Sequence, residues 1–102
     1  MAQFQAYRNT RPSRAELPYL LDVQSDLVQT GTRLVVPLVR KERYGRLYTR
    51  LNLELTVEGV AVVAAVSDMA AIDARELREA VADCSSQRAD ILSAIDFLIS
   101  GY

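Results

Sequence analysis

Residues 51–66 read LNLELTVEGVAVVAAV and predict a β-hairpin. Apolar and polar side chains alternate from Tyr48 to Glu58, which is the pattern of a strand with one buried face. Glu58 and Gly59 then form a tight connection to a continuous apolar run, Val60 to Val66. We expect one face of the first strand to be buried and the other exposed, with these members respectively: Leu51, Leu53, Leu55 and Val57; Asn52, Glu54, Thr56 and Glu58.

Three further strand-like segments precede this hairpin. Gln3 to Tyr7 alternates loosely, Leu17 to Gln24 is a second apolar run, and Thr32 to Val39 is rich in β-branched residues. Pro37 favours an edge strand or a bulge, because proline cannot donate to a sheet ladder. Short strands at this spacing indicate a small antiparallel barrel or sandwich.

The chain changes character after Met69. Asp73 and Glu76 have the spacing of a capping box, and the stripe from Leu77 to Cys84 predicts a helix or a short turn. A stronger helix follows, capped by Ser85 or Ser86. Its apolar stripe is Ala89, Leu92, Ile95 and Ile99, widened by Ile91, Phe97 and Leu98. This stripe is broad for a helix that covers one side of a barrel, so we expect a second buried surface, most simply a dimer contact.

The composition limits the chemistry that is available. The 102 residues carry 12 Lys+Arg against 13 Asp+Glu, and a net charge of −1 argues against direct, non-specific nucleic-acid binding. The absence of His excludes nucleophile–imidazole pairs and the commonest zinc ligand. We interpret Cys84, the single cysteine, as a small buried hydrophobe. We expect one domain over residues 1–102, without catalytic residues, metal or cofactor.

The targeting signals and the cysteine content of the sequence predict a cytoplasmic protein. We recognise no secretory leader, and the longest apolar run, Val60 to Val66, is far too short to span a bilayer. A lone cysteine fits a reducing compartment. We therefore expect no membrane association.

Two short motifs have simple structural interpretations. DVQSD, residues 22–26, is typical of a strand end that runs into a turn in which Asp22 and Asp26 accept backbone N–H groups. In DMA, residues 68–70, Asp68 ends a strand and Met69 fills the core.

The same motifs follow one another in an order that resembles a known family. DVQSD precedes Thr30, Arg33 and Pro37-Leu38, and DMA precedes Val81-Ala82-Asp83, Ser85, Asp90-Ile91 and Ala94-Ile95. Together with Ser13-Arg14, this series resembles the CcdB family of toxins, which poison DNA gyrase and belong to toxin–antitoxin systems. The resemblance implies a β-rich α+β fold: an SH3-like antiparallel β-barrel of about five to seven short strands with a C-terminal α-helix. It also implies a homodimer.

The resemblance further implies a binding surface for the A subunit of DNA gyrase, which the family traps on cleaved DNA. That surface surrounds the dimer axis and includes the last helical turns and the chain termini. The implied gyrase-binding residues are Ser25, Leu27, Val28, Ser93, Asp96, Ile99, Ser100, Gly101 and Tyr102. The characteristic terminus of the family is Trp-Gly-Ile, so Ser100 stands where a tryptophan is expected.

A second implied partner is a CcdA-like antitoxin, whose disordered C-terminal segment folds onto the toxin dimer and neutralises it. An acidic tail would suit two basic segments, Arg8 to Arg14 with three arginines and Arg40 to Arg50 with five basic residues and one acid. We expect antitoxin contacts at Arg8, Arg11, Arg14, Arg43 and Arg46.

Three functions remain open. The preferred one is a gyrase-poisoning toxin, of the kind that serves plasmid maintenance. The second is a CcdB-fold protein that keeps antitoxin binding but no longer poisons gyrase, a hypothesis motivated by Ser100. The third is an endoribonuclease toxin of the same fold, motivated by the basic segment Arg40 to Arg50, where Arg and carboxylates could serve as acid and base.

Overall fold

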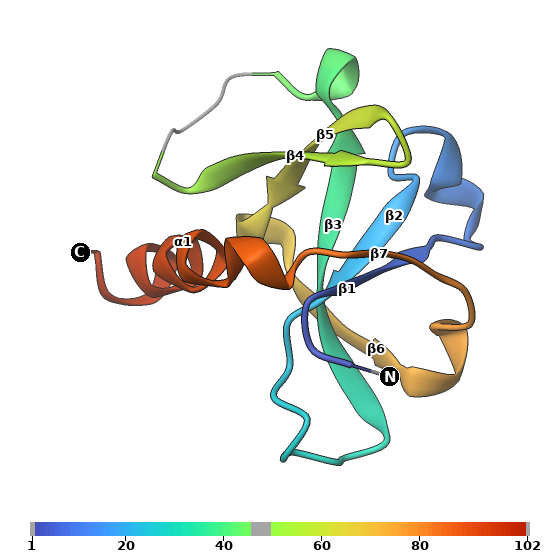
Figure 1. Ribbon diagram of the computed structural model, residues 1–102, viewed down its shortest axis with the longest axis vertical. Helices are drawn as coiled ribbons and strands as arrows, with labels where there is room; N and C mark the ends of the chain where they lie inside the picture. The colour runs from blue at the N-terminus through green and yellow to red at the C-terminus, as the bar shows by residue number, and fades with distance from the viewer. Residues whose placement is uncertain (1, 46–49, 102) are drawn as a thin grey trace.

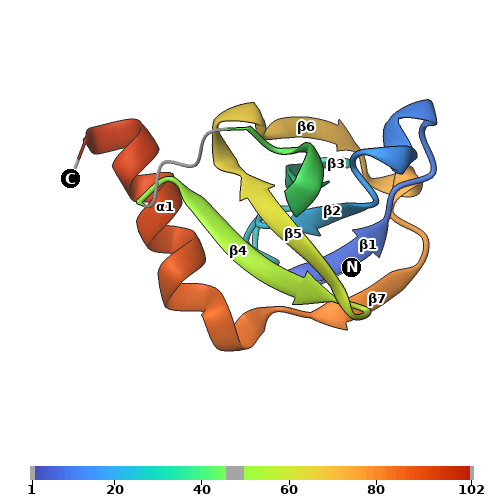
Figure 2. The same cartoon turned by 90° about the horizontal axis from the view of Figure 1, so that it is seen from above.

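The computed structural model describes residues 2–45 and 50–101, which form an antiparallel seven-stranded sheet and one C-terminal helix (Figure 1). The strand order is β4-β5-β3-β2-β1-β7, with β6 paired to β3. The sheet curls into a half-barrel, which confirms the expected fold class (Figure 2). The elements are β1 (Gln5–Arg8), β2 (Tyr19–Asp22), β3 (Thr32–Arg40), β4 (Asn52–Val57), β5 (Val60–Ala65), β6 (Ala70–Asp73), β7 (Ala80–Asp83) and α1 (Arg88–Ser100).

The predicted hairpin is β4–β5. Its strands pair from Asn52 opposite Ala65 to Val57 opposite Val60. Glu58 and Gly59 have φ values of 50° and 76°, and positive φ at both central residues is what a type I′ turn requires. The alternation is confirmed at Leu55 and Val57, which are buried, and at Glu54, Thr56 and Glu58, which are exposed. Tyr48 lies outside the described residues.

The prediction for Asn52 was wrong, because this side chain is buried. Its Nδ2 donates to the Tyr44 hydroxyl at 3.0 Å. Tyr44 follows the short 3₁₀ turn Lys41–Arg43 after β3, so a contact between segments satisfies the amide. Burial of this polar group therefore depends on a partner that alternation within one strand cannot reveal.

The prediction that Pro37 marks an edge strand or a bulge was also wrong. β3 is central: β2 pairs along one side, with Leu20 opposite Pro37. On the other side β6 pairs as far as Val35 and β5 begins at Leu38. Pro37 falls where β3 changes partner, so its missing N–H leaves no gap in a ladder on that side.

No helix forms between Leu77 and Cys84. Asp73 does cap a turn, since its side chain accepts the Arg75 N–H at 2.9 Å, but the turn is a 3₁₀ turn, Ala74–Glu76. The chain then extends as β7, which pairs with β1 and covers the edge that β1 would otherwise leave unpaired. A tertiary pairing overrides the local helical pattern here.

Helix α1 begins at Arg88, one or two residues later than a cap at Ser86 or Ser85 implies. Ser85 and Ser86 lie in a 3₁₀ turn, Ser85–Gln87, and neither makes a side-chain cap to α1. The Ser85 N–H instead donates to Asp83 Oδ1 at 2.8 Å, which fixes the turn and delays the helix. Ser85 therefore belongs to the turn that leads into α1.

Only part of the expected apolar stripe of α1 packs against the barrel. Ile91 and Ala94 are the buried residues, whereas Leu92 and Ile99 are exposed. Figure 2 shows α1 lying beside β4, and contacts with β4 and with the turn Val66–Asp68 cover one side of the helix. Ile95 is half-buried and packs against the core cluster, whereas Ala89 and Leu98 are exposed.

The core fills the concave side of the sheet. Its completely buried side chains include Leu21, Val36, Leu38, Val57 and Val62. Cys84 is buried in the same cluster, as expected, and burial raises the pKa of its thiol. Met69 is half-buried and packs against this cluster. In the part of the chain that the structure describes, no helix has the length and apolar character needed to cross a membrane.

Candidate binding surface

The loop between β2 and β3, residues 24–31, presents an apolar tip to solvent. Leu27 is 95% exposed and Val28 is 48% exposed. Figure 1 shows this loop projecting from one end of the sheet. Isolated exposed apolar side chains are common on protein surfaces, but two adjacent ones on a projecting loop form a small contact site.

Beneath this tip the DVQSD stretch forms the turn that its sequence predicts. Asp22 Oδ1 accepts the Gln24 N–H at 3.1 Å, and Asp26 Oδ1 accepts the Gln3 N–H at 3.0 Å. Ser25 Oγ accepts the Leu27 N–H at 3.2 Å. The loop is therefore held from both ends by its own polar side chains.

A buried ion pair anchors this turn to β3. Arg33 Nε donates to Asp22 Oδ2 at 2.8 Å, and these side chains are 7% and 0% exposed. The same guanidinium donates through Nη2 to Asp26 Oδ1 at 3.1 Å and to the Gln24 carbonyl at 3.0 Å. Sequence reasoning found Arg33 only as part of a family motif, because the pairing of residues 11 apart depends on the hairpin between them.

The outer face of α1 is the second apolar surface. A shallow hollow of about 480 Å³ lies along it, lined by Ala89, Leu92, Ser93, Ile95, Asp96 and Ile99. Leu92 is 37% exposed and Ile99 is 74% exposed. The structure thus brings together three of the predicted site residues, Ser93, Asp96 and Ile99, on one helical face.

The last residues of α1 are held by the helix itself. Ser100 Oγ donates to the Asp96 carbonyl at 2.7 Å, one turn earlier. Gly101 adopts φ 78°, and its N–H donates to the Phe97 carbonyl at 2.9 Å, so it ends the helix as glycine commonly does. Tyr102 lies outside the described residues.

The loop and the helix surface do not meet within one protomer. In Figure 1 the tip of the β2–β3 loop and the C-terminal end of α1 point in different directions from the sheet. The predicted gyrase-binding residues therefore form two groups: Ser25, Leu27 and Val28 on the loop, and the remaining ones on α1. A single partner that contacts both groups must be large.

The early arginines are engaged with acidic residues of the same chain. Arg8 Nη2 lies 3.1 Å from Glu58 Oε2, and Arg8 Nε lies 3.2 Å from Glu79 Oε1. Arg11 Nε lies 2.8 Å from Glu76 Oε1. The Tyr19 hydroxyl and Arg8 both hold the pKa of Glu58 below its usual value. The charge of this segment is thus largely balanced locally, except at Arg14, which is exposed and bonds only the Arg11 carbonyl among the described residues.

The basic segment Arg40 to Arg50 is partly used by the fold as well. Lys41 Nζ lies 3.2 Å from Glu54 Oε2, and the Arg50 guanidinium lies 4.3 Å from the centre of the Phe97 ring. Arg43 is exposed and makes no ion pair within residues 2–45 and 50–101. Arg46 lies outside the described residues.

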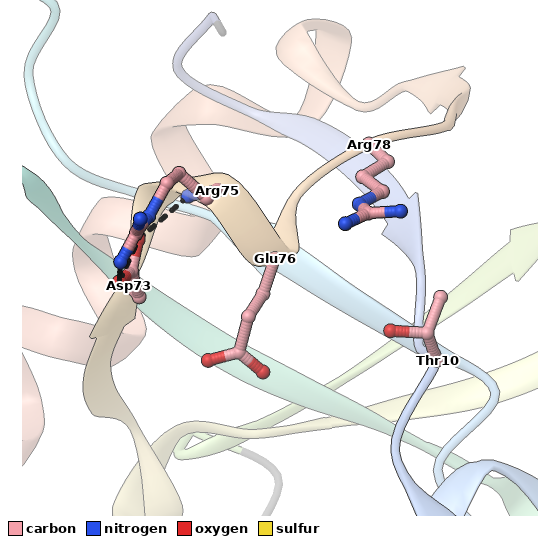
Figure 3. A pocket seen from close by; sticks show the side chains of 5 residues that line it. All are labelled: Thr10, Asp73, Arg75, Glu76 and Arg78. Carbon is pink, nitrogen blue, oxygen red and sulfur yellow. Dashed lines mark hydrogen bonds and ion pairs between the residues drawn. The ribbon is translucent and has the colours of Figure 1, made fainter.

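A polar hollow of about 400 Å³ adjoins the early arginines (Figure 3). It is lined by Thr10, Asp73, Arg75, Glu76 and Arg78. Arg75 folds back onto Asp73 with an N–O distance of 2.7 Å and lowers the pKa of that carboxyl to about 2. Since Glu76 is paired with Arg11, both carboxylates of the hollow are occupied by arginines, and they do not form an acid–base pair. In the described ranges, no three His, Cys, Asp or Glu side chains gather as a metal site requires.

Comparison with known protein families identifies the family that the chain matches. A family model described as "CcdB protein" matches residues 3–101. The matched range takes in the whole sheet, the β2–β3 loop and α1, and so includes both apolar surfaces.

Proposed function

The chain belongs to the CcdB family, which comprises toxins of toxin–antitoxin systems of the gyrase-poison kind, and on this premise we propose that it binds the A subunit of DNA gyrase and traps the enzyme on cleaved DNA. One observation supports the proposal most strongly. Large apolar side chains that the protomer leaves uncovered, Leu27, Val28 and Ile99, stand at positions that the family resemblance assigns to gyrase. In this proposal the toxin catalyses no reaction itself: it binds gyrase and arrests the reaction that gyrase catalyses.

The proposal includes a homodimer formed through the outer face of α1. Leu92 and Ile99 lie on this face, and burial of apolar area is the main driving force of such association. A two-fold axis beside α1 would bring two helix ends together and make one continuous surface from both copies. A dimer also presents a larger surface, on which one partner can contact both the loop group and the helix group.

The proposal also includes a CcdA-like antitoxin with an acidic, disordered tail. Among the predicted contacts that the structure describes, Arg14 and Arg43 are exposed and make no ion pair, whereas Arg8 and Arg11 would have to exchange Glu58, Glu79 and Glu76 for the tail. Replacing Arg14 and Arg43 by glutamate should weaken antitoxin binding and reduce its salt dependence. An unchanged affinity in this double variant contradicts the assignment.

The cytoplasm, where gyrase acts, is the proposed location.

Controlled expression in a bacterium tests the main proposal. We expect growth arrest with DNA double-strand breaks that disappear in a host with a toxin-resistant gyrase A subunit. Purified protein should bind an isolated gyrase A fragment, and Leu27→Ser together with Ile99→Ser should abolish both effects while thermal unfolding stays cooperative. Normal growth together with absence of binding to the fragment refutes gyrase as the target.

A second function is favoured by the geometry of Ser100. Its hydroxyl donates to the Asp96 carbonyl, and the side chain offers no aromatic surface where the family characteristically carries tryptophan. Loss of a central aromatic anchor commonly costs an interface about 2–4 kcal/mol. A protein that keeps antitoxin binding but does not poison gyrase would follow. Ser100→Trp should then create toxicity in an otherwise harmless protein, and a harmless Ser100→Trp variant counts against this alternative.

A further inference from the structure

Several specific hydrogen bonds hold the β2–β3 loop beneath its exposed tip. Besides the turn already described, Gln24 links the loop to β3: its Nε2 donates to the Val28 carbonyl at 2.8 Å, and its Oε1 accepts the Leu34 N–H at 2.9 Å. The Val28 N–H donates to the Ser25 carbonyl at 3.0 Å. All these bonds support a tip whose leucine touches almost nothing, since Leu27 is 95% exposed.

Asp26 extends the buried ion pair of Asp22 and Arg33 to the surface of the loop. The buried charges of Asp22 and Arg33 already balance each other at 2.8 Å. Asp26 adds a second carboxylate to the same guanidinium although its own side chain is 55% exposed. This contact fixes Asp26, which stands at the surface, to a buried side chain of β3.

From these contacts we propose that Asp26 and Arg33 form a clasp that positions the Leu27–Val28 tip for its protein partner. Asp26 Oδ1 receives both Arg33 Nη2 and the Gln3 N–H, and thereby ties the loop to β3 and to the start of the chain. The residue directly before the tip is thus fixed from two sides. A tip held in its bound conformation loses less conformational entropy when it binds, which raises affinity without any new contact.

The clasp depends on the forked shape of the guanidinium. Nε serves Asp22, while Nη2 serves Asp26 and the Gln24 carbonyl. A lysine in place of Arg33 keeps one charge beside Asp22 but cannot reach both carboxylates and the carbonyl with a single ammonium group. Asp26 and Arg33 are therefore positioning residues, and Leu27 and Val28 make the contact.

Amide hydrogen exchange of the free protein tests the clasp directly. In Asp26→Ala we expect the Gln3 and Val28 amides to exchange about tenfold faster or more, because their local structure opens. Asp26→Asn should lie between this variant and the wild type, since its amide oxygen still accepts a hydrogen bond. Asp68→Asn is the matched control: Asp68 is exposed and has no ion pair in the part of the chain that the structure describes. Unchanged exchange at Gln3 and Val28 in Asp26→Ala overturns the proposal, whatever the protein binds.

Affinity for the gyrase A fragment tests the positioning role, and this arm rests on the proposed function. Asp26→Ala should weaken binding about tenfold while its thermal midpoint stays near the wild-type value. Leu27→Ala should weaken binding with normal exchange, and adding it to Asp26→Ala should cost less than it does alone. Full affinity in Asp26→Ala overturns the positioning role.

The two proposals fail in distinguishable ways. A wild-type protein that does not bind the fragment refutes gyrase as the partner, and the exchange experiment then decides the clasp alone. Arg33→Lys gives an independent check, since it should reproduce the faster exchange of Asp26→Ala. Wild-type exchange in a folded Arg33→Lys protein contradicts the need for the guanidinium fork.

Discussion

Ile91 and Ile99 are the same residue type on the same helix, and we expect their replacement by alanine to separate folding from binding. Ile91 is 2% exposed and belongs to the core cluster, whereas Ile99 is 74% exposed on the outer face of α1. Both substitutions gain the same helix propensity, because alanine replaces isoleucine in each. The difference between the two variants therefore reports burial alone.

The magnitudes follow from these exposures. Truncation of a fully buried isoleucine costs about 2–5 kcal/mol, from lost transfer free energy and from the cavity that remains. Only about a quarter of Ile99 is buried, so its truncation should cost less than about 1 kcal/mol in the isolated protomer. We expect Ile91→Ala to reduce the free energy of unfolding at least twice as much as Ile99→Ala.

Urea unfolding followed by circular dichroism, repeated over a range of protein concentrations, measures both quantities. Any additional loss in Ile99→Ala should grow with protein concentration, because a dimer stabilises the folded state by mass action. The Ile91→Ala loss should persist at the lowest concentration. A concentration-independent loss above about 2 kcal/mol in Ile99→Ala would falsify the assignment of this residue to an outer binding face, because such a loss marks a core residue.

Three further changes test other parts of the fold. Gly59→Ala should lower stability by about 1 kcal/mol because residue 59 has φ 76°, whereas Gly45→Ala, where φ is not positive, should change it little; calorimetry compares them. The pKa of Asp73 is lowered from 3.8 to about 2, so its contribution to stability is complete above about pH 4 and is lost as pH falls towards 2. The thermal midpoint of Asp73→Asn should therefore fall less steeply between about pH 4 and pH 2 than that of the wild type. Equal slopes in the two proteins contradict the argument. Cys84 is buried with a raised thiol pKa, so a thiol reagent should label the native protein slowly at about pH 8, and labelling at the rate of the unfolded chain contradicts its burial.

The elements that sequence reasoning predicted well are those determined by neighbouring residues. The Glu58-Gly59 turn needs positive φ at two adjacent positions, and glycine in the second favours it wherever the hairpin lies in the fold. The turn in DVQSD is equally local, since Asp22 and Ser25 accept N–H groups two residues ahead. Both partners of such an interaction lie within a few residues of each other, so a single sequence suffices to predict it.

The predictions that failed concern interactions between distant segments. Leu77 to Cys84 carries a helical pattern, yet residues 80–83 form β7 because β1 offers them a strand partner. Pro37 is tolerated in a central strand because β5 and β6 happen to meet opposite it. Which side of α1 is buried depends on where the helix meets β4 and the sheet, and no periodicity within the helix records that position.

The candidate site shows the same division. By itself the sequence determined a β-rich fold with a C-terminal helix, a family, and the apolar character of Leu27, Val28 and Ile99, because pattern and composition are local properties. Only the tertiary structure decided that these side chains are uncovered, that Arg8 and Arg11 are already paired, and that Arg33 fastens Asp26 beneath the loop tip. The physical reason is that exposure and ion pairing depend on which distant segments the fold brings together, and that is settled only when the sheet closes around its core.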